Sequence, residues 1–451
     1  MRIRTIETPD LGNRSYLVDD GTVSVVIDPQ RDIDRVETLL EDGPGLAGVL
    51  ETHIHNDYLT GGLQLARRAG AAYGINAADE VDFDRLPLHD DQVLALGTLA
   101  IRVLATPGHT DTHLSYLVTD TAAVTQPPVL FSGGSLLYGT VGRTDLVDPA
   151  RTRELSLAQY RSAHRLGALP GDTVLCPTHG FGSFCAAAPA VARGGQDQST
   201  IAAERGANVA LLAADEQSFA DELIAGLGAY PAYYAEMAPR NLRGPSLPEL
   251  GLPEPLTPTA LARLLHTGAH VVDLRPGADF AADHLVRTLS IGLGSQFATY
   301  VGWLTPYDEP LVVIGETAAD LLTARRALAR IGREEFEAAW GSLDALAPAV
   351  PRRGYRRASF KELATERVAG DLVLDVRRVE EYAAGHLPGA VHLALHELTA
   401  RLDELPRRRT WVHCAGGFRA GTAASILDAA GREVIHIDDR YDGAVELGLT
   451  R

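Results

Sequence analysis

The chain has 451 residues, of which 45% are apolar and 22% are charged, as expected for a globular protein of about three domains. Acidic residues outnumber basic ones by 59 to 41, and the net charge of −18 argues against binding to nucleic acid or to an anionic membrane. The first residues lack an apolar run, and no apolar window reaches the roughly 18 residues that span a bilayer. Three scattered cysteines predict no disulfide framework, which favours a reducing, cytoplasmic location.

Two proline-rich stretches without periodicity, at 237–258 and 346–357, are predicted to be linkers. They divide the chain into three predicted domains, at residues 1–240, 255–346 and 358–451. The first domain opens with strand-like runs at 13–18 and 22–27 and carries more strands than helices. An α/β fold with an α/β/β/α sandwich is therefore expected there.

The two shorter domains resemble each other at a fixed offset of 102 positions, which predicts an internal duplication. Each alternates strand-like and helical runs, so each should form a parallel sheet flanked by helices. The matching pairs are the runs 272–275 and 374–377, Phe280 and Tyr382, His284 and His386, and Leu285 and Leu387.

Residues 52–58 place two imidazoles and a carboxylate at alternate positions, as His53, His55 and Asp57. This run follows the apolar segment 46–50 and precedes a helical pattern that opens at Gly61, so it should be a loop between a strand and a helix. Side chains of these types, turned inward together, form a metal-ligand cluster. Solvated loop residues are the alternative interpretation of the run taken alone.

Three further runs follow predicted strands, where loops can converge on one site. The run 106–110 contains His109 and Thr110, the run 175–180 contains His179, and the run 130–137 contains Gly134. Their order along the chain strengthens the prediction of a metal site.

Together these runs resemble the metallo-β-lactamase superfamily, in its branch of glyoxalase II and persulfide dioxygenases. The segments 28–32 and 139–146, the latter with Arg143, resemble runs of the persulfide dioxygenases. The resemblance implies that His53 and His109 hold Fe(II) and that Arg143 lies near the substrate. The third iron ligand of that family is an aspartate, and its position here is Gly134.

Two departures from the family pattern affect the metal. Gly134 supplies no ligand, and Tyr58 stands where the last histidine of the signature belongs. His55 could complete a three-histidine face with His53 and His109, which suits zinc at least as well as iron. A second metal would use Asp57, residue 58 and His179, so a dinuclear hydrolase is not expected. An aspartate at 134 is expected to face His53 and His109 and to raise iron occupancy.

The third domain carries a cysteine at the start of a six-residue loop between a strand and a helical pattern at 422–430. The loop includes Gly416, Gly417 and Arg419 after Cys414. Inward-pointing N–H groups and a helix N-terminus should stabilise a thiolate or its persulfide, and Arg419 could bind thiosulfate or sulfite. An inert buried cysteine beside a turn is the alternative.

This loop resembles that of the rhodanese-type sulfurtransferases, as do the runs 375–377 and 381–390. The resemblance implies that Cys414 carries sulfur. In the second domain the corresponding strand, 311–314, runs into Gly315-Glu316-Thr317 without a cysteine or a matching arginine. That copy is expected to be catalytically silent and to serve as a scaffold or interface.

The remaining cysteines lie in the first domain. In persulfide dioxygenase–rhodanese fusions a cysteine in the stretch of Cys185 can lie near the metal pocket and carry sulfane sulfur, although a core position is equally compatible. Cys176 sits inside an apolar run and is expected in the core. Tyr58, Thr110 and Cys185 are the further predicted substrate contacts.

The resemblance implies an enzyme of sulfane-sulfur metabolism and sulfide detoxification. Its first domain would oxidise a low-molecular-weight persulfide of glutathione, bacillithiol or coenzyme A to sulfite. Its rhodanese would join sulfite and sulfane sulfur as thiosulfate, or run the reverse reaction. The alternatives are a sulfurtransferase that only binds persulfides, a glyoxalase II-like thioester hydrolase, and a non-enzymatic sulfur carrier or regulatory binding protein. A homo-oligomer is the expected assembly.

Overall fold

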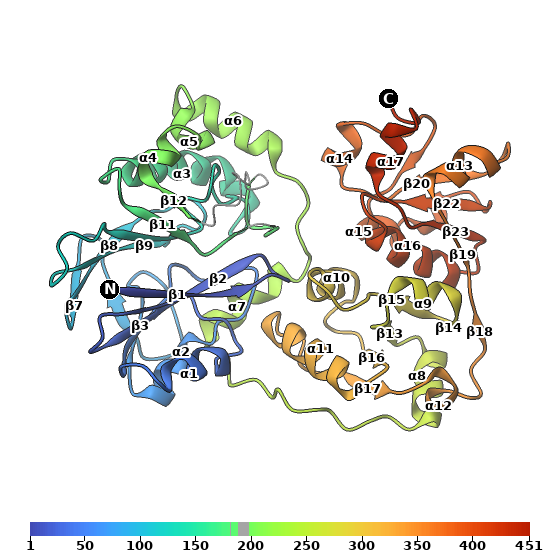
Figure 1. Cartoon of the computed structure of the whole chain (residues 1–451), viewed down its shortest axis with the longest axis horizontal. Coiled ribbons are helices and arrows are strands. Elements are labelled where there is room, and N and C mark those ends of the chain that lie inside the picture. The colour runs from blue at the N-terminus through green and yellow to red at the C-terminus, as the bar shows by residue number, and fades with distance from the viewer. Residues whose placement is uncertain (181, 188–197) are drawn as a thin grey trace. The chain divides into compact units, whose positions relative to one another are not determined.

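The computed structural model describes residues 1–180, 182–187 and 198–451, which form two compact units of α/β structure (Figure 1). Unit 1 contains Met1–Glu249 and Ala329–Gly332, and unit 2 contains Leu250–Leu328 and Arg333–Arg451. Within these residues, no helix combines the length and the apolar character needed to cross a bilayer.

Unit 1 is built on two six-stranded mixed sheets. The first, in spatial order, contains β1 (Arg2–Thr8), β2 (Asn13–Asp19), β3 (Ser24–Ile27), β4 (Leu46–Leu50), β5 (Ala72–Asn76) and β6 (Leu86–Leu88). The second contains β12 (Ser199–Thr200), β11 (Val174–Pro177), β10 (Val129–Gly133), β9 (Leu114–Asp120), β8 (Leu99–Ala105) and β7 (Val93–Leu96). The predicted runs at 13–18, 22–27 and 46–50 all fall on strands.

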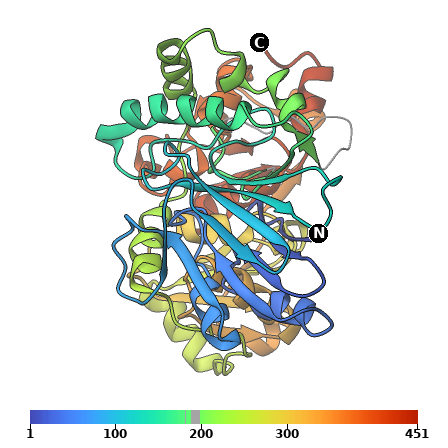
Figure 2. The same cartoon turned by 90° about the vertical axis from the view of Figure 1, so that its left-hand side faces the viewer.

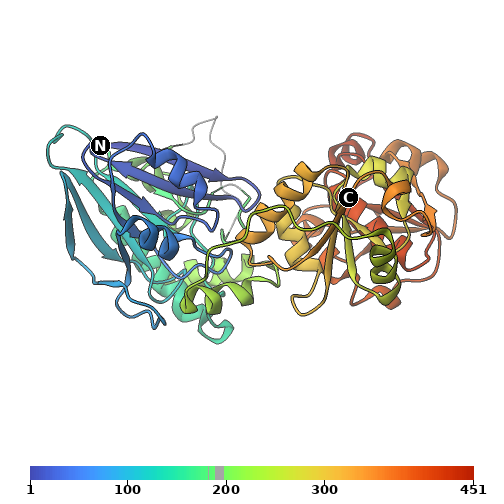
Figure 3. The same cartoon turned by 90° about the horizontal axis from the view of Figure 1, so that it is seen from below.

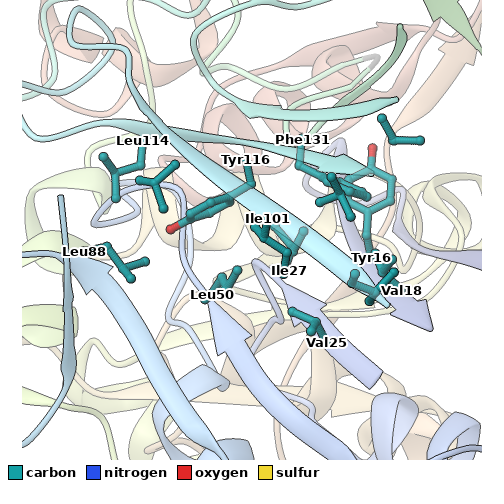
Figure 4. Close-up of a cluster of buried hydrophobic side chains, with 14 residues drawn as sticks. Tyr16, Val18, Val25, Ile27, Leu50, Leu88, Ile101, Leu114, Tyr116 and Phe131 are labelled. Atoms are coloured by element: carbon teal, nitrogen blue, oxygen red, sulfur yellow. The ribbon is translucent and has the colours of Figure 1, made fainter. Parts of the chain in front are cut away.

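The two sheets enclose one apolar core, which contains Tyr16, Ile27, Tyr116 and Phe131 (Figure 4). Side chains alternate between the faces of each strand, so Leu17, between the core residues of β2, points to the opposite face. A sheet with two apolar faces needs a second covering layer.

Helices supply those outer layers. The helices α1 (Asp34–Leu40) and α2 (Gly62–Ala69) pack on the first sheet and lie in front of it in Figure 3. The second sheet is covered by α3, the long teal helix of Figure 2, with α4, α5 and α6. Their bounds are α3 (Thr152–Gly167), α4 (Ile201–Arg205), α5 (Val209–Leu212) and α6 (Glu216–Gly226), and the 3-10 turn η1 (Pro149–Arg151) precedes α3. The expected α/β/β/α sandwich is confirmed.

One helix of unit 1 was not expected from the sequence. The helix α7 (Tyr234–Arg243) occupies the start of the stretch predicted to be a linker, and Pro239 lies inside it. Tyr234, Met237 and Asn241 are its buried side chains, so a regular helical spacing of buried residues is present despite the proline. The Asn241 side chain donates to the backbone carbonyls of His55 and Tyr58, both at 2.9 Å, and so braces the loop of the histidine cluster.

Unit 2 contains two parallel sheets and a small antiparallel pair. The four-stranded sheet is β15 (Thr288–Ser290), β13 (His270–Asp273), β16 (Leu311–Gly315) and β17 (Glu337–Trp340). The five-stranded sheet is β19 (Arg356–Ala358), β23 (Val434–Ile437), β22 (Thr410–His413), β20 (Leu372–Asp375) and β21 (Val391–His392). The antiparallel pair joins β14 (His284–Leu285) to β18 (Arg352–Arg353). Strand β18 lies in the second predicted linker.

Helices flank both parallel sheets, as the alternating pattern predicted. In the first copy they are α8 (Pro258–Thr267), α9 (Gly277–Ala282), α10 (Phe297–Leu304), α11 (Ala318–Arg330) and α12 (Leu343–Leu346). In the second they are α13 (Phe360–Glu366), α14 (Val379–Ala383), α15 (Leu395–Leu398), η2 (Leu402–Glu404), α16 (Phe418–Ala429) and α17 (Tyr441–Glu446).

The internal repeat is visible in the hydrogen bonds of the two copies. Arg275 bonds to Asp273 through Nε and Nη2 and to the carbonyl of Asp283 at 3.0 Å. At an offset of 102, Arg377 bonds to Asp375 in the same way and to the carbonyl of Gly385 at 2.7 Å. The two copies therefore share their folding pattern down to one buried ion pair.

Candidate metal centre and sulfur-transfer loop

Four buried histidines of unit 1 converge from loops at the ends of three strands. His53 and His55 follow β4, His109 follows β8, and His179 follows β11. The ring centroid of His53 lies 4.1 Å from that of His55 and 4.8 Å from that of His109, and the His109 and His179 centroids are 5.1 Å apart. The predicted metal-site histidines are thus neighbours in space.

Hydrogen bonds fix which nitrogen His53 and His109 offer. Nδ1 of His109 donates to the backbone carbonyl of Arg143 at 2.7 Å. The Thr52 hydroxyl donates to the Asp28 carboxylate at 2.7 Å, so it accepts a hydrogen bond from Nδ1 of His53 at 2.9 Å. Both rings therefore keep their proton on Nδ1 and present the Nε2 lone pair.

The same reasoning applies to the other two histidines. Nδ1 of His179 lies 3.2 Å from the Asn13 amide oxygen and 3.4 Å from the Asp57 carboxylate, both of which are acceptors. Nε2 of His55 lies 3.1 Å from the Glu51 carboxylate. Nε2 of His179 and Nδ1 of His55 are left as the inward nitrogens.

The inward atoms have no hydrogen-bond partner among the described residues. Each buried polar atom without a partner costs about 1–3 kcal/mol, so several at one place call for a ligand. The unpartnered atoms are His53 Nε2, His55 Nδ1, Asp57 Oδ1, His109 Nε2 and His179 Nε2. Imidazole nitrogens backed by carboxylates and carbonyls are the donor set of transition-metal sites, so these residues fit a metal ion.

The possible ligand atoms that lie within 4.8 Å of one another form three groups among the described residues, and two of these groups share His179. These two are His53, His55 and His179, and His109, His179 and Cys185, whereas the third is Asp28, Glu51 and His55. The expected face of His53, His55 and His109 is not among the close groups of the described residues. His179, which the sequence associated with a second metal, instead belongs to both groups that contain more than one histidine.

Carboxylates next to the cluster influence the pKa values of its histidines. Burial alone would lower the pKa of His55, but Asp28 and Glu51 raise it to about 10. Burial raises the pKa of Glu51 itself to about 7. Burial and the neighbouring histidines hold the pKa of His53 well below its usual value, and burial lowers that of His109 to about 3. His53 and His109 are thus neutral at pH 7, and a metal would displace a proton from His55.

Tyr58 lies behind the cluster rather than in it. Its hydroxyl is 2.9 Å from Nε2 of His55, and its ring stacks on that imidazole at 4.2 Å. The Tyr58 hydroxyl thus faces the outer nitrogen of His55 and not its inward nitrogen. Its predicted contact with substrate stays a prediction.

Four residues of the site were not singled out by sequence reasoning as site residues. Asp28 accepts hydrogen bonds from Thr52 and Thr178 and so ties three strand ends together. Its position directly after a strand was the available signal. The others, Glu51, His113 and Tyr234, depend on contacts between distant parts of the chain. His113 differs from the other histidines because both its ring nitrogens have protein partners, Thr106 and the N–H of Gly134.

The expected space beside Gly134 is filled, which corrects the prediction for this position. A β-carbon built on Gly134 would lie 2.2 Å from Cδ2 of His109, and one on Gly142 would lie 2.6 Å from Nδ1 of the same ring. The His109 imidazole is thus held between two glycines, where no side chain at 134 can pass. An aspartate there would displace His109 rather than face it.

We therefore expect Gly134→Asp to lower metal content and to destabilise the protein by about 1–3 kcal/mol, the usual effect of overpacking. Metal analysis and thermal unfolding of the purified variant check this. Gly45→Asp is the matched control, because a β-carbon there meets no atom within 4 Å. Higher iron occupancy in Gly134→Asp at unchanged stability would contradict the geometry.

The other predicted residues of unit 1 surround the cluster differently. Thr110 lines a cavity of about 430 Å³, and its buried hydroxyl has no partner. The Cys185 sulfur is buried and lies 3.8 Å from the Tyr234 hydroxyl, and burial raises its pKa well above the usual value. Arg143 donates to Asp145 and to the backbone carbonyls of Phe184 and Gly228. Its predicted contact with substrate stays a prediction.

In unit 2, Cys414 begins the predicted loop between β22 and α16 and is 2% exposed. The helix starts at Phe418, four residues earlier than the pattern indicated, so its N-terminus closes the loop. Gly417 has φ of 89°, and a β-carbon there would lie 2.2 Å from Oδ1 of Asp438, so the turn requires glycine. Among the described hydrogen bonds, none is donated by the backbone N–H groups of residues 415–418, which are left for an anion.

Arg419 is held beside this loop by an ion pair. Its Nη1 and Nη2 donate to the Glu381 carboxylate at 2.5 and 2.7 Å. Side-chain bonding to Glu381 raises the pKa of Arg419 despite burial, and Arg419 lowers that of Glu381 to about 2. The guanidinium is therefore a positive charge held at the second residue of the helix that follows Cys414.

The first copy contributes side chains next to this loop. The Tyr300 ring of α10 lies 5.7 Å from that of Phe418, and Trp303 stacks on His396 at 4.6 Å. Burial raises the pKa of Tyr300 to about 12. In the first copy itself, only Glu316 and Thr317 separate β16 from α11, so no comparable loop forms.

Comparisons with known proteins agree with this arrangement. The family description "Rhodanese-like domain" matches residues 359–445. Hydroxyacylglutathione hydrolase of Acidiphilium cryptum (strain JF-5) is 38% identical over 131 residues, which cover 28% of this chain and 54% of that protein. The enzyme of the same name from Prochlorococcus marinus (strain MIT 9211) is 31% identical over 163 residues, 35% of this chain and 61% of that protein. The chain thus spans less than two thirds of these relatives.

One solved structure is similar to a larger part of the chain than these relatives are. A metallo-β-lactamase from Staphylococcus aureus subsp. aureus COL has a TM-score of 0.65 and 26% identity, and the match covers 75% of this chain and 98% of that one. The match covers more residues than unit 1 contains, so the likeness continues into unit 2. The chain is therefore a fusion of a metallo-β-lactamase-fold unit with a rhodanese domain.

Proposed function

We propose that this protein is an enzyme of sulfane-sulfur metabolism that oxidises a low-molecular-weight persulfide in unit 1 and transfers sulfur at Cys414. The observation that carries the proposal is the loop after β22. A buried cysteine, backbone N–H groups that donate no hydrogen bond among the described residues, a helix N-terminus and the guanidinium of Arg419 meet there. Each of these groups stabilises a negatively charged sulfur or an incoming oxyanion.

The rhodanese step is a sulfur exchange that balances without a further reagent. The terminal sulfur of a Cys414 persulfide bonds to sulfite, the sulfur–sulfur bond to Cys414 breaks, and thiosulfate leaves while the thiolate is regenerated. The reverse reaction charges Cys414 from thiosulfate. Arg419, held by Glu381, would add positive charge beside the oxyanion bound by the loop N–H groups, and Tyr300 of the first copy would exclude water from one side of the loop.

Unit 1 would supply the sulfite. In the net conversion one persulfide, one dioxygen and one water give one thiol, one sulfite and two protons. A bound Fe(II), or a zinc ion in a binding-only form, would be held by His179 with His53 and His55 or with His109 and Cys185. Iron would supply the redox chemistry. The chain's own groups fix the ring tautomers, and the buried Thr110 hydroxyl would orient the substrate. Placing both steps on one chain keeps reactive sulfur at high effective concentration.

Hydrolysis of a glutathione thioester is the second candidate, because the curated relatives are hydroxyacylglutathione hydrolases. A dinuclear site of the expected type lacks two of its side chains here, since residue 58 is tyrosine with its hydroxyl behind His55 and residue 134 is glycine. The hydrolase is therefore the weaker proposal.

Oxygen uptake separates the two proposals. The iron-loaded full chain is expected to consume dioxygen with a small organic persulfide and to form sulfite in equal amount. It is expected to hydrolyse a hydroxyacylglutathione at least about a hundredfold more slowly, since binding alone cannot replace an activated water. Rapid thioester hydrolysis without oxygen uptake would favour the hydrolase and reject the dioxygenase.

A further inference from the structure

The cavity of unit 1 has the size and position of a substrate pocket. Its volume of about 430 Å³ lies within the usual ~300–1,000 Å³ of small-molecule sites. Thr110, which follows His109, and Tyr234, whose hydroxyl lies 3.8 Å from the Cys185 sulfur, both line it. A ligand in this cavity would therefore lie beside the histidine cluster.

One buried polar atom in the cavity wall lacks a partner. Thr110 is 4% exposed, and its hydroxyl makes no hydrogen bond to any residue that the structure describes. A buried hydroxyl of this kind is normally paired, so its partner should come from a ligand. This observation points to a bound molecule independently of the charges that surround it.

The charge of the cavity wall is unusual for an enzyme whose substrate is a thiol that carries carboxylates. Its polar groups are carboxylates, hydroxyls and an amide, and none of its described residues is lysine, arginine or histidine. These groups belong to Asn56, Asp79, Thr110, Asp111, Thr112, Tyr230 and Tyr234. A carboxylate on the ligand would thus meet the carboxylates of Asp79 and Asp111, of which the second is paired with Arg151, and no cationic side chain of the lining itself.

Three arginines next to the lining residues are already bonded. Arg85 donates to the backbone carbonyl of Asp79 at 2.9 Å. Arg151, which is not a lining residue, donates to Asp111 at 2.8 Å. Arg143 lies against the Tyr230 ring at 4.4 Å and is bound to Asp145 through two bonds of 2.7 Å. None of these guanidinium groups can turn to a ligand carboxylate without breaking a hydrogen bond or an ion pair.

We propose that this cavity selects a persulfide whose carrier is an uncharged, hydroxyl-bearing thiol and disfavours carriers that bear carboxylates. The acceptor-rich wall matches hydroxyl donors such as those of a sugar or polyol, and the two tyrosine rings offer apolar faces. This inference rests on the proposed function, because it takes the substrate to be a persulfide, and it argues against glutathione as the carrier.

Matched pairs of ligands test the inference on the full chain. The persulfides of N-acetylcysteine and of its methyl ester differ by one carboxylate. We expect the ester to exceed the acid at least tenfold in kcat/KM for oxygen uptake. We also expect Asp79→Asn, Asp111→Asn and the double variant to narrow that ratio, while Asp84→Asn, outside the cavity lining, leaves it unchanged. Equal or better use of the acid would overturn the inference.

Binding of unreactive analogues separates this inference from the proposed activity. The S-methyl thioethers of the same acid and ester, and a methyl thioglucoside beside cyclohexyl methyl sulfide, are titrated by calorimetry. Preference for the ester and the thioglucoside without any oxygen uptake would retain the cavity assignment and reject the dioxygenase. Brisk oxygen uptake with no preference in either pair would retain the dioxygenase and reject the cavity assignment.

Discussion

Cys414→Ser is expected to abolish the formation of thiocyanate from thiosulfate and cyanide, with a loss of at least about a thousandfold. A serine oxygen cannot form the sulfur–sulfur bond that carries the transferred atom. The substitution removes one buried sulfur of a residue that is 2% exposed and leaves Gly417, the helix N-terminus and Arg419 in place. The loop should therefore keep its conformation and lose its sulfur-transfer activity.

The other two cysteines provide matched controls for this result. Cys176 and Cys185 lie in unit 1, and replacing either by serine is expected to leave thiocyanate formation within about twofold of the wild type. A Cys414→Ser protein with near wild-type activity would contradict the assignment. If that activity were lost on mutating Cys185, the sulfur-transfer site would belong to unit 1.

His179→Ala is expected to have the largest effect on metal binding. His179 belongs to both close groups of histidine ligands, so its loss leaves only two side chains in each. Changes to a metal's outer partners alone reduce affinity by ~10–100-fold, and loss of a ligand should exceed that range. Metal content by mass spectrometry, with a titration of apo-protein by Co(II), measures the effect.

His113 is the matched control for this substitution. It is as buried as the other histidines, but both its ring nitrogens are bonded to Thr106 and Gly134. His113→Gln should reduce stability without releasing the metal from the folded protein. If His113→Gln lost the metal while His179→Ala retained it, the assigned ligands would be wrong.

Cobalt also distinguishes the two groups that share His179. A sulfur ligand gives Co(II) an intense near-ultraviolet charge-transfer band, and histidines do not. If Cys185 joins His109 and His179, the band is present in the wild type and absent from Cys185→Ser. If His53 and His55 hold the ion instead, both proteins lack the band.

Local patterns predicted those parts of the molecule that depend on neighbours in sequence. The apolar run 46–50 is strand β4 residue for residue, because a short buried run bounded by a polar loop has few other solutions. The histidine loop and the Cys414 loop were found because metal ligands and anion-binding turns need particular residue types at close spacing. The repeat at 102 positions reappears in the ion pairs of Arg275 and Arg377.

Features that depend on distant segments could not be predicted. The proline content of the stretch that begins at Met237 concealed α7, whose Asn241 is fixed by contacts with a loop about 180 positions earlier in the chain. The effect of Gly134 was also hidden. The sequence showed a missing carboxylate, whereas packing shows that the His109 ring fills the space between Gly134 and Gly142.

Analysis of the sulfur products tests most directly the claim that one chain joins persulfide oxidation to sulfur transfer. The iron-loaded wild type, given an excess of small organic persulfide and dioxygen, should yield thiosulfate as a major product. Cys414→Ser should consume oxygen at a similar rate and yield sulfite, because unit 1 keeps all its groups. Thiosulfate from the Cys414→Ser protein at the wild-type yield, measured by chromatography after thiol labelling, would contradict the account.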